Sequence, residues 1–174
     1  MRRNRAALGS AAFFVAGPIA LMGVVPWRLT RWIVRKRYPV PVRWVGTGLI
    51  VAGGVVVAST FTRFVREGLG TPVPVAAPEH LVVGGIYRYV RNPMYVAGQA
   101  ILWGQTLVLG QPKLLLYAAA VGVSAASFAH WYEEPTLRRR FGAEYEAYRQ
   151  AVPGWLPRLR PWQGPDAPSP AREG

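Results

Sequence analysis

Four long stretches of this chain contain no Asp, Glu, Lys or Arg, and they constrain its fold more than any other feature. The stretches are Ala6–Trp27, Trp44–Thr62, Asn92–Pro112 and Leu114–Tyr132. Each is close to the ~20 residues that an α-helix needs to cross about 30 Å of hydrocarbon. We therefore predict an all-α, polytopic membrane protein with about four transmembrane helices and a C-terminal amphipathic helix.

The positions of the charged residues argue against a nucleic-acid-binding domain. The chain is 51% hydrophobic and only 17% charged, whereas soluble domains are usually about 25% charged. The net charge is +13, but the basic residues lie in the gaps between the uncharged stretches, where membrane orientation and anionic headgroups favour them. A nucleic-acid surface requires a basic face on a folded soluble domain. We expect membrane lipids as partners and no nucleic acid.

The first uncharged stretch has two interpretations. Arg2, Arg3 and Arg5 precede an apolar run, as they do in a secretory signal or a twin-arginine signal. The run is long for a signal peptide, however, no clear cleavage site follows it, and Pro26-Trp27 is typical of a helix end at the interface. We favour a transmembrane helix.

The basic residues also predict an orientation, with one conflict. Lys113 is the only basic residue between the last two stretches, so the positive-inside rule places that turn outside and Arg91 and Arg138–Arg140 in the cytoplasm. Four crossings then place the basic segment Arg28–Arg43 on the outer side, against the rule. Either an interfacial turn lets its arginines reach the headgroups, or the first segment enters the membrane without crossing it.

The segment after Pro135 predicts an amphipathic helix that lies on the cytoplasmic surface and could cover a site. Its apolar face consists of Leu137, Phe141, Tyr145 and Tyr148. Val152–Pro157 ends this helix and offers a tryptophan anchor. We expect one domain over residues 1–162 and a disordered tail, rich in Pro, Ala and Gly, over residues 163–174.

Small and polar residues in the uncharged stretches predict close contacts between the helices. The small residues are Ala118, Gly122 and Ala126 in one stretch, and Gly46, Gly48, Gly53 and Gly54 in another. Small side chains allow two helix backbones to approach closely. Gln99 and Gln105 are polar at membrane depth, and hydrogen bonds between helices explain them most simply.

The Asn92-Pro93 step predicts a binding site at the membrane boundary. Asn92 is a favoured N-cap and Pro93 suits a first helical turn, so the third helix begins here and offers its N–H groups and positive dipole end to an anion. The fourth stretch returns to the same membrane face and ends at Glu133 and Glu134. This start is flanked by Tyr87, Arg91 and Tyr95.

Tyrosine faces, a carboxylate and a helix N-terminus together suit a zwitterionic ligand that carries a further cation. S-adenosylmethionine has this chemistry, because its sulfonium suits aromatic faces and acids and its carboxylate suits the helix N-terminus. The same residues have an ordinary explanation, in which Tyr and Arg are interfacial anchors and the Glu pair is a solvated helix end. Composition and spacing leave both open.

Five sequence blocks occur in order within roughly residues 79–160. They are Val83-Gly84-Gly85-Ile86-Tyr87, Arg91-Asn92-Pro93-Met94-Tyr95, Glu133-Glu134-Pro135-x-Leu137, Phe141-Gly142-x-x-Tyr145-x-x-Tyr148 and Val152-Pro153. In their order and spacing they resemble the isoprenylcysteine carboxyl methyltransferase and phospholipid methyltransferase superfamily. This resemblance implies a helical membrane enzyme that uses S-adenosylmethionine from the cytoplasm.

The resemblance also implies roles for individual residues. Asn92 stands where the family has a histidine, and Ala129 stands where the prenylcysteine enzymes have an arginine one turn before the glutamate. The absence of that arginine argues against a prenylcysteine acceptor. The implied cofactor-binding residues are Glu79, His80, Leu81, Val82, Tyr87, Asn92, Pro93, Met94, Tyr95 and Glu133.

We therefore predict methyl transfer from S-adenosylmethionine to a lipophilic or membrane-partitioning acceptor. We expect an integral protein of the cell membrane, with its active site facing the cytoplasm. No metal is expected, because the sulfonium is already an activated methyl donor, and no residue stands out as a catalytic base. Arg91 either orients the acceptor or anchors its loop. The alternative is a non-catalytic membrane scaffold with a degenerate methyltransferase fold.

Overall fold

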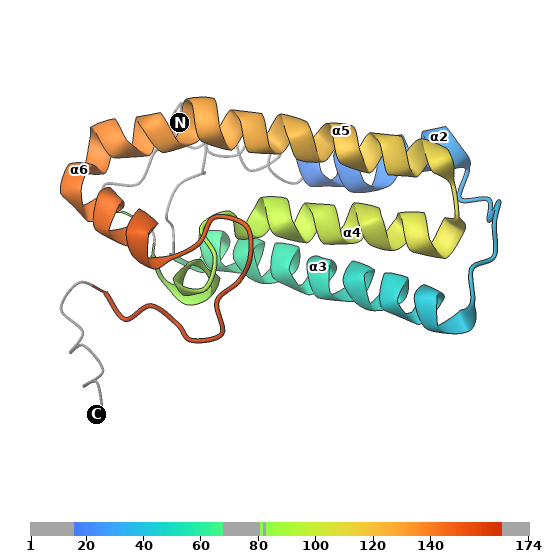
Figure 1. Cartoon of the computed structure of the whole chain (residues 1–174), viewed down its shortest axis with the longest axis horizontal. Coiled ribbons are helices and arrows are strands. Elements are labelled where there is room, and N and C mark those ends of the chain that lie inside the picture. The colour runs from blue at the N-terminus through green and yellow to red at the C-terminus, as the bar shows by residue number, and fades with distance from the viewer. Residues whose placement is uncertain (1–15, 68–80, 82, 165–174) are drawn as a thin grey trace.

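The computed structural model describes residues 16–67, 81 and 83–164, with the backbone alone for residues 61–67. In this part of the chain the regular structure is entirely helical. Three long helices lie side by side (Figure 1), namely α3 (Val40–Glu67), α4 (Pro93–Leu109) and α5 (Pro112–Phe128). The expectation of an all-α fold is confirmed for the described residues.

A shorter helix precedes these three and packs against α4 and α5. It is described from Ala16 and continues through the π-helical segment η1 (Ala20–Val24) into α2 (Val25–Thr30). Two carbonyls of η1 accept side-chain hydrogen bonds, Met22 from Gln105 Nε2 at 2.7 Å and Leu21 from Tyr117 Oη at 2.8 Å. The expected bond between helices is therefore confirmed for Gln105. A π-helical turn widens the backbone and changes the hydrogen-bonding pattern, which suits such contacts.

Glycines bring α3 and α4 into close contact, which confirms the prediction from sequence at two of its four glycine positions. A Cβ atom on Gly46 would lie 2.8 Å from the carbonyl oxygen of Gly104, and one on Gly53 would lie 2.6 Å from that of Ala97. These distances are too short for any larger residue, so the two backbones meet directly. Gly48 and Gly54 have no neighbour of this kind.

The turn end of the α4–α5 hairpin, Leu109–Pro112, is held by the backbone of the segment before α3. Gly110 adopts a left-handed conformation with φ 59°, and a Cβ atom there would collide with the carbonyl oxygen of Lys36. The amide of Arg35 donates to the carbonyl of Leu109 at 2.9 Å. Gln111 Nε2 donates to the carbonyl of Ile33 at 2.7 Å.

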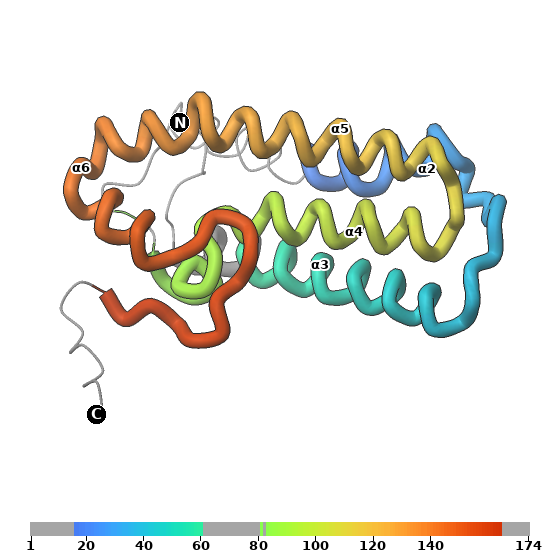
Figure 2. Tube along the Cα trace, viewed as in Figure 1, coloured from blue at the N-terminus to red at the C-terminus, as the bar shows by residue number. Residues whose placement is uncertain are grey.

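The last helical region begins with α5 and changes direction near its end. After α5 come the π-helical segment η4 (Ala129–Glu133) and α6 (Glu134–Ala151), in one continuous run. Gly142 interrupts α6 with φ 51° and ψ −121°, a combination that is essentially restricted to glycine. The chain bends there, so that the end of α6 folds back toward the start of α4 (Figure 2).

The apolar face predicted for this last helix packs on the protein itself. Tyr145, Tyr148 and Val152 form a buried cluster, each at most 3% exposed. Around this cluster pack Leu81, Val83, Leu137, Phe141, Ala151 and Trp162. Helix α6 therefore covers the segment before α4 with the face that the sequence identifies as apolar.

Two helical segments of the described chain are long and apolar enough to cross a membrane. They are Val40–Thr60 and the continuous run Pro112–Ala151, whose apolar part ends at Tyr132. Helix α4 has 17 residues, and the first helix is described only from Ala16. Four crossings thus stay a prediction. The predicted tail lies largely outside the described residues.

Candidate functional site

The predicted helix start lies where the two chain ends of the α4–α5 hairpin come together. We call this region the open end; it consists of residues 91–95 together with Glu133 and Glu134. Helix α4 begins at Pro93 with Asn92 as its N-cap residue, as predicted. The Asn92 side chain makes no capping hydrogen bond. Its Nδ2 atom is buried and has no hydrogen-bond partner among the described residues. A buried donor without a partner costs free energy, so this amide is available to a ligand that brings an acceptor.

The two sides of the open end meet through Tyr95 and Glu133. Tyr95 Oη donates to Glu133 Oε2 at 3.1 Å. Tyr95 lies on the first turn of α4, and Glu133 is the last residue of η4. The prediction that the hairpin returns Glu133 to the same end as Tyr95 is confirmed. Burial raises the pKa of the Glu133 carboxyl, and the hydrogen bond from Tyr95 opposes this shift.

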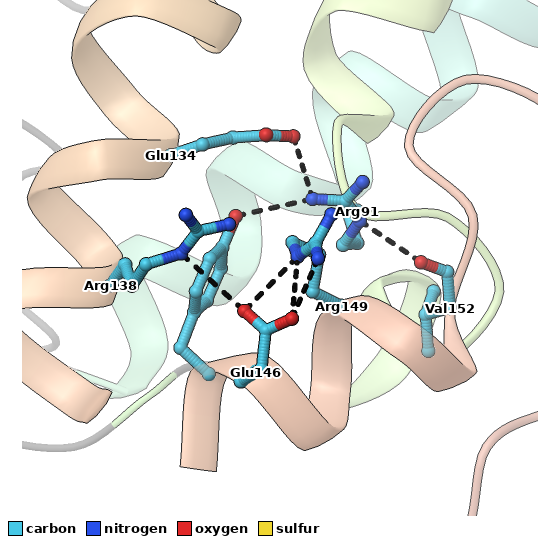
Figure 3. Close-up of polar contacts among 7 residues, drawn as sticks. Arg91, Glu134, Arg138, Glu146, Arg149 and Val152 are labelled. Atoms are coloured by element: carbon cyan, nitrogen blue, oxygen red, sulfur yellow. Dashed lines mark hydrogen bonds and ion pairs between the residues drawn. The ribbon is translucent and has the colours of Figure 1, made fainter. Parts of the chain in front are cut away.

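Arg91 connects three parts of the chain (Figure 3). Its Nη1 donates to Glu134 Oε1 at 2.7 Å and to Tyr145 Oη at 3.1 Å, and its Nε donates to the carbonyl of Val152 at 2.9 Å. The Arg91 and Glu134 side chains are 13% and 22% exposed. Of the two roles considered for Arg91, these contacts support the anchoring one, because three of its donor bonds go to the protein.

A C-terminal strap, residues 152–162, passes beside the segment that precedes α4 (Figure 1). The amides of Arg91 and Asn92 donate to the carbonyls of Pro153 and Gly154 at 2.9 and 3.2 Å. In the opposite direction, the amide of Arg158 donates to Tyr89 and that of Trp162 to Arg88, each at 2.9 Å. The strap thus fixes the backbone of the open end.

Two further contacts connect α6 and the strap to predicted site residues. Tyr148 Oη donates to the carbonyl of Tyr87 at 2.7 Å, which ties Tyr87 to α6. The indole of Trp155 stacks on the ring of Tyr95, with centroids 6.2 Å apart and an interplanar angle of 27°. Sequence reasoning treats Trp155 only as a membrane anchor and does not connect it to Tyr95. A local sequence pattern offers no signal for that contact.

The other predicted site residues have varied positions. Glu79, His80 and Val82 lie outside the described residues. Leu81 packs against the buried Tyr145 cluster, and Met94 lies half-buried on the first turn of α4. Their expected contacts with a cofactor stay predictions. Ala129 is 2% exposed at the start of η4, so an arginine side chain at this position would have to displace its neighbours.

A second group of charged side chains lies nearby on α6 and is more exposed (Figure 3). Glu146 pairs with Arg149 at 2.6 Å and with Arg138 at 3.4 Å. The hydrogen bond from Arg149 lowers the pKa of the Glu146 carboxyl. Arg138 and Glu146 lie on opposite sides of Gly142, so their ion pair spans the bend. Within residues 16–67, 81 and 83–164, no group of three or more His, Asp or Glu side chains could hold a metal ion.

Comparison of the sequence with known proteins identifies its family. The model of the phospholipid methyltransferase family matches residues 41–144. Over 91 residues, or 48% of the chain, the sequence is 32% identical to a phosphatidylethanolamine N-methyltransferase of Phaeosphaeria nodorum. Over 77 residues, or 44% of the chain, it is 38% identical to a protein-S-isoprenylcysteine O-methyltransferase of Schizosaccharomyces pombe.

The curated relatives are much longer than the matching region. The match covers 9% of the Phaeosphaeria protein and 33% of the Schizosaccharomyces protein. A phosphatidylethanolamine N-methyltransferase of Aspergillus niger is 26% identical over 121 residues, which are 63% of this chain and 11% of that protein. No solved structure gives a significant match.

Proposed function

Because this chain belongs to the phospholipid methyltransferase family, we propose that it is a membrane methyltransferase that uses S-adenosylmethionine and acts on a lipophilic acceptor. We propose further that it crosses the membrane with four helices and carries its site at the cytoplasmic face. The basic residues Arg138–Arg140, which follow the last apolar stretch, support this orientation. Membership of the family and the pair of long apolar helices support the membrane location.

The observation that carries this proposal is the hydrogen bond between Tyr95 and Glu133. It joins two residues that are 38 positions apart in the sequence, and both are predicted to contact the cofactor. Beside them, Asn92 offers a buried amide donor that no other described residue satisfies. A carboxylate, an aromatic ring and a donor at a helix N-terminus form a set that fits a cation at one end of a ligand and an anion at the other.

Different residues of the open end would bind different parts of such a ligand. Asn92 and the first amides of α4 would receive the carboxylate, and Tyr95 and Glu133 would face the cationic part. When bound, S-adenosylmethionine supplies an activated methyl group on a sulfonium. The protein then needs mainly to position the acceptor in line and to exclude water from it. Arg91 and Glu134 hold the backbone of this site in place.

The first experiment is a calorimetric titration of the purified protein with S-adenosylmethionine. We expect saturable binding. A protein without saturable binding would instead be a scaffold with a degenerate site. The acceptor is then identified by incubating the protein with labelled S-adenosylmethionine and a membrane-lipid extract, followed by mass spectrometry of the labelled product. Labelled lipid in the presence of the protein, and none with heat-inactivated protein, is the supporting result.

Ala129 leads to a prediction about one acceptor class. Since no cation stands at this position, a prenylcysteine carboxylate lacks an ion-pair partner one turn before Glu133. The loss of such a partner costs about 1–3 kcal/mol or more in a desolvated site. We expect negligible methylation of a farnesylated cysteine derivative compared with the true acceptor. Robust methyl ester formation in a direct assay would contradict this expectation and redirect attention to the remaining arginines.

A further inference from the structure

Trp155 is held at the candidate site by the backbone on its N-terminal side. The carbonyls of Pro153 and Gly154, the two preceding residues, accept hydrogen bonds from Arg91 and Asn92. A Cβ atom on Gly154 would lie 3.2 Å from Nη2 of Arg91, so the strap lies directly against the Arg91 side chain. These main-chain hydrogen bonds fix the backbone next to Trp155 and place this residue beside the candidate site.

The ring of Tyr95 joins this indole to a carboxylate. Its face stacks on Trp155, and its hydroxyl group donates to Glu133. The indole is still 39% exposed, so part of its surface is open to a further contact. Aromatic faces attract cations through the ring quadrupole, most strongly for tryptophan, and a nearby carboxylate adds to that attraction.

We propose that Trp155 is a binding residue of this site, and that its indole and the Tyr95 ring form an aromatic surface beside Glu133 for a methyl-bearing onium cation. This inference rests on the proposed function and adds a residue and a ligand chemistry to it. Two sources supply such a cation in a methyltransferase: the sulfonium of the methyl donor and the ammonium of a methylated acceptor headgroup. Their shared chemistry is a positive charge spread over apolar methyl groups.

The first arm of the test compares S-adenosylmethionine with S-adenosylhomocysteine, which lacks the methyl group and the sulfonium charge. Both are titrated by calorimetry into the full-length protein and into the Trp155→Leu and Trp155→Phe variants. If the sulfonium occupies the surface, Trp155→Leu weakens S-adenosylmethionine binding about 3- to 30-fold and leaves S-adenosylhomocysteine binding unchanged. Trp155→Phe, which keeps an aromatic face, shows a smaller loss. A merely structural role would weaken both ligands equally.

The second arm uses tetramethylammonium as the probe, in maltoside micelles that contain no choline. Saturation-transfer NMR measures its contact with the protein, and sodium chloride at equal ionic strength is the reference. If the surface receives an ammonium headgroup, the transfer is lost in Trp155→Leu while the affinities of the two cofactor forms stay unchanged. This arm tests the role of Trp155 even if the protein binds neither cofactor form. Such a failure to bind would contradict the proposed function but not the aromatic surface.

The matched control is Trp131→Leu, which removes a tryptophan that is 77% exposed on η4. It should change neither the cofactor affinities nor the tetramethylammonium signal. Melting temperatures of all variants are measured to compare their folding. The proposal is overturned if Trp155→Leu melts like the unmodified protein and yet preserves both the discrimination between the two cofactor forms and the tetramethylammonium contact. It is also overturned if Trp131→Leu has the same effects as Trp155→Leu.

Discussion

The two ends of the α4–α5 hairpin are held by different kinds of interaction. At the turn end, Gly110 lies against the carbonyl of Lys36, and an amide and a carboxamide donate to backbone carbonyls. At the open end, Arg91 and Glu134 form an ion pair, and Tyr95 and Glu133 share a hydrogen bond. Backbone groups take part at both ends, but at the open end ionisable side chains add an ion pair and a further hydrogen bond.

This difference separates structural from functional requirements. The polar groups described at the turn end find partners within the protein, so nothing there calls for a ligand. The open end retains the buried amide of Asn92, which has no hydrogen-bond partner in the part of the chain that the structure describes, and the partly exposed indole of Trp155. Buried polar groups are nearly always paired in native proteins, so this exception beside a carboxylate and an aromatic pair supports the proposed ligand site.

The largest effect is expected from Gly110→Ala at the turn end. The residue would have to keep φ at 59° and avoid the Lys36 carbonyl, which should lower the free energy of unfolding by about 3 kcal/mol. The measurement is the melting temperature in detergent, together with cofactor affinity at a temperature where the variant is folded. We expect a large fall in melting temperature and unchanged affinity.

The control for this prediction is Gly48→Ala on α3, where a Cβ atom would meet no neighbour. Alanine in a helix interior is favoured over glycine by roughly 0.5–1 kcal/mol, so this variant should melt at the same or a higher temperature. Equal destabilisation by the two substitutions would show that Gly110 has no special role in the turn.

The next effect is expected from Arg91→Met at the open end, which leaves Glu134 charged and without its partner. For a buried pair this costs ~3–5 kcal/mol, and we expect about 2 kcal/mol here because both side chains keep some exposure to solvent, which screens their interaction. Addition of Glu134→Gln should recover part of the loss in a double-mutant cycle. Arg149→Met, which breaks an exposed pair with Glu146, should leave the melting temperature unchanged. A double mutant with simply additive losses would contradict the coupling.

The third prediction concerns Glu133→Gln, which keeps the shape of the side chain and removes its charge. We expect about tenfold weaker binding of S-adenosylmethionine, or roughly 1.4 kcal/mol, with little change in melting temperature. Because burial raises the pKa of the Glu133 carboxyl, its charge is lost at a higher pH than that of an ordinary glutamate as the solution is acidified. Binding should therefore weaken with acid in the unmodified protein and not in the variant. Glu146→Gln is the control, and equal affinities in the two variants would remove Glu133 from the site.

The smallest effect is expected from Tyr95→Phe, which removes the bond to Glu133 and keeps the aromatic face. We expect a two- to threefold loss of cofactor affinity, equivalent to about 0.4–0.7 kcal/mol. Tyr95→Ala should be severe, because it also removes the ring that stacks on Trp155. The calorimetric affinities of the two variants provide the comparison. If Phe and Ala have the same effect, the hydroxyl group and not the ring face is what the ligand requires.

Local sequence rules predict part of this site well. The Asn92-Pro93 step fixes where α4 begins, and the length of the last two apolar stretches brings Glu133 back to Tyr95. Close contact at Gly46 and Gly53 also follows from residue size. In each case the relevant information lies within one helix or one hairpin.

The missing parts depend on contacts between distant segments. The strap is joined to residues 88–92 mainly through backbone groups, which every sequence possesses, so no residue pattern identifies it. The strap also carries Trp155, whose ring stacks on Tyr95. No distinctive local signal marks the π-helical segments η1 and η4. The bend at Gly142 is equally hard to predict, because a glycine within a helical pattern often stays helical. Packing between distant segments decides these features.

The strap also sets an order for biosynthesis. Its partners at residues 88–92 are made early, whereas Pro153, Gly154, Arg158 and Trp162 leave the ribosome only after the apolar stretch of α5. If the hairpin crosses the membrane as proposed, it can insert before the open end has its final backbone contacts. The nascent protein would pass through a stage in which its helices are in place and its site is unfinished, and a cofactor present at that stage would select the completed form.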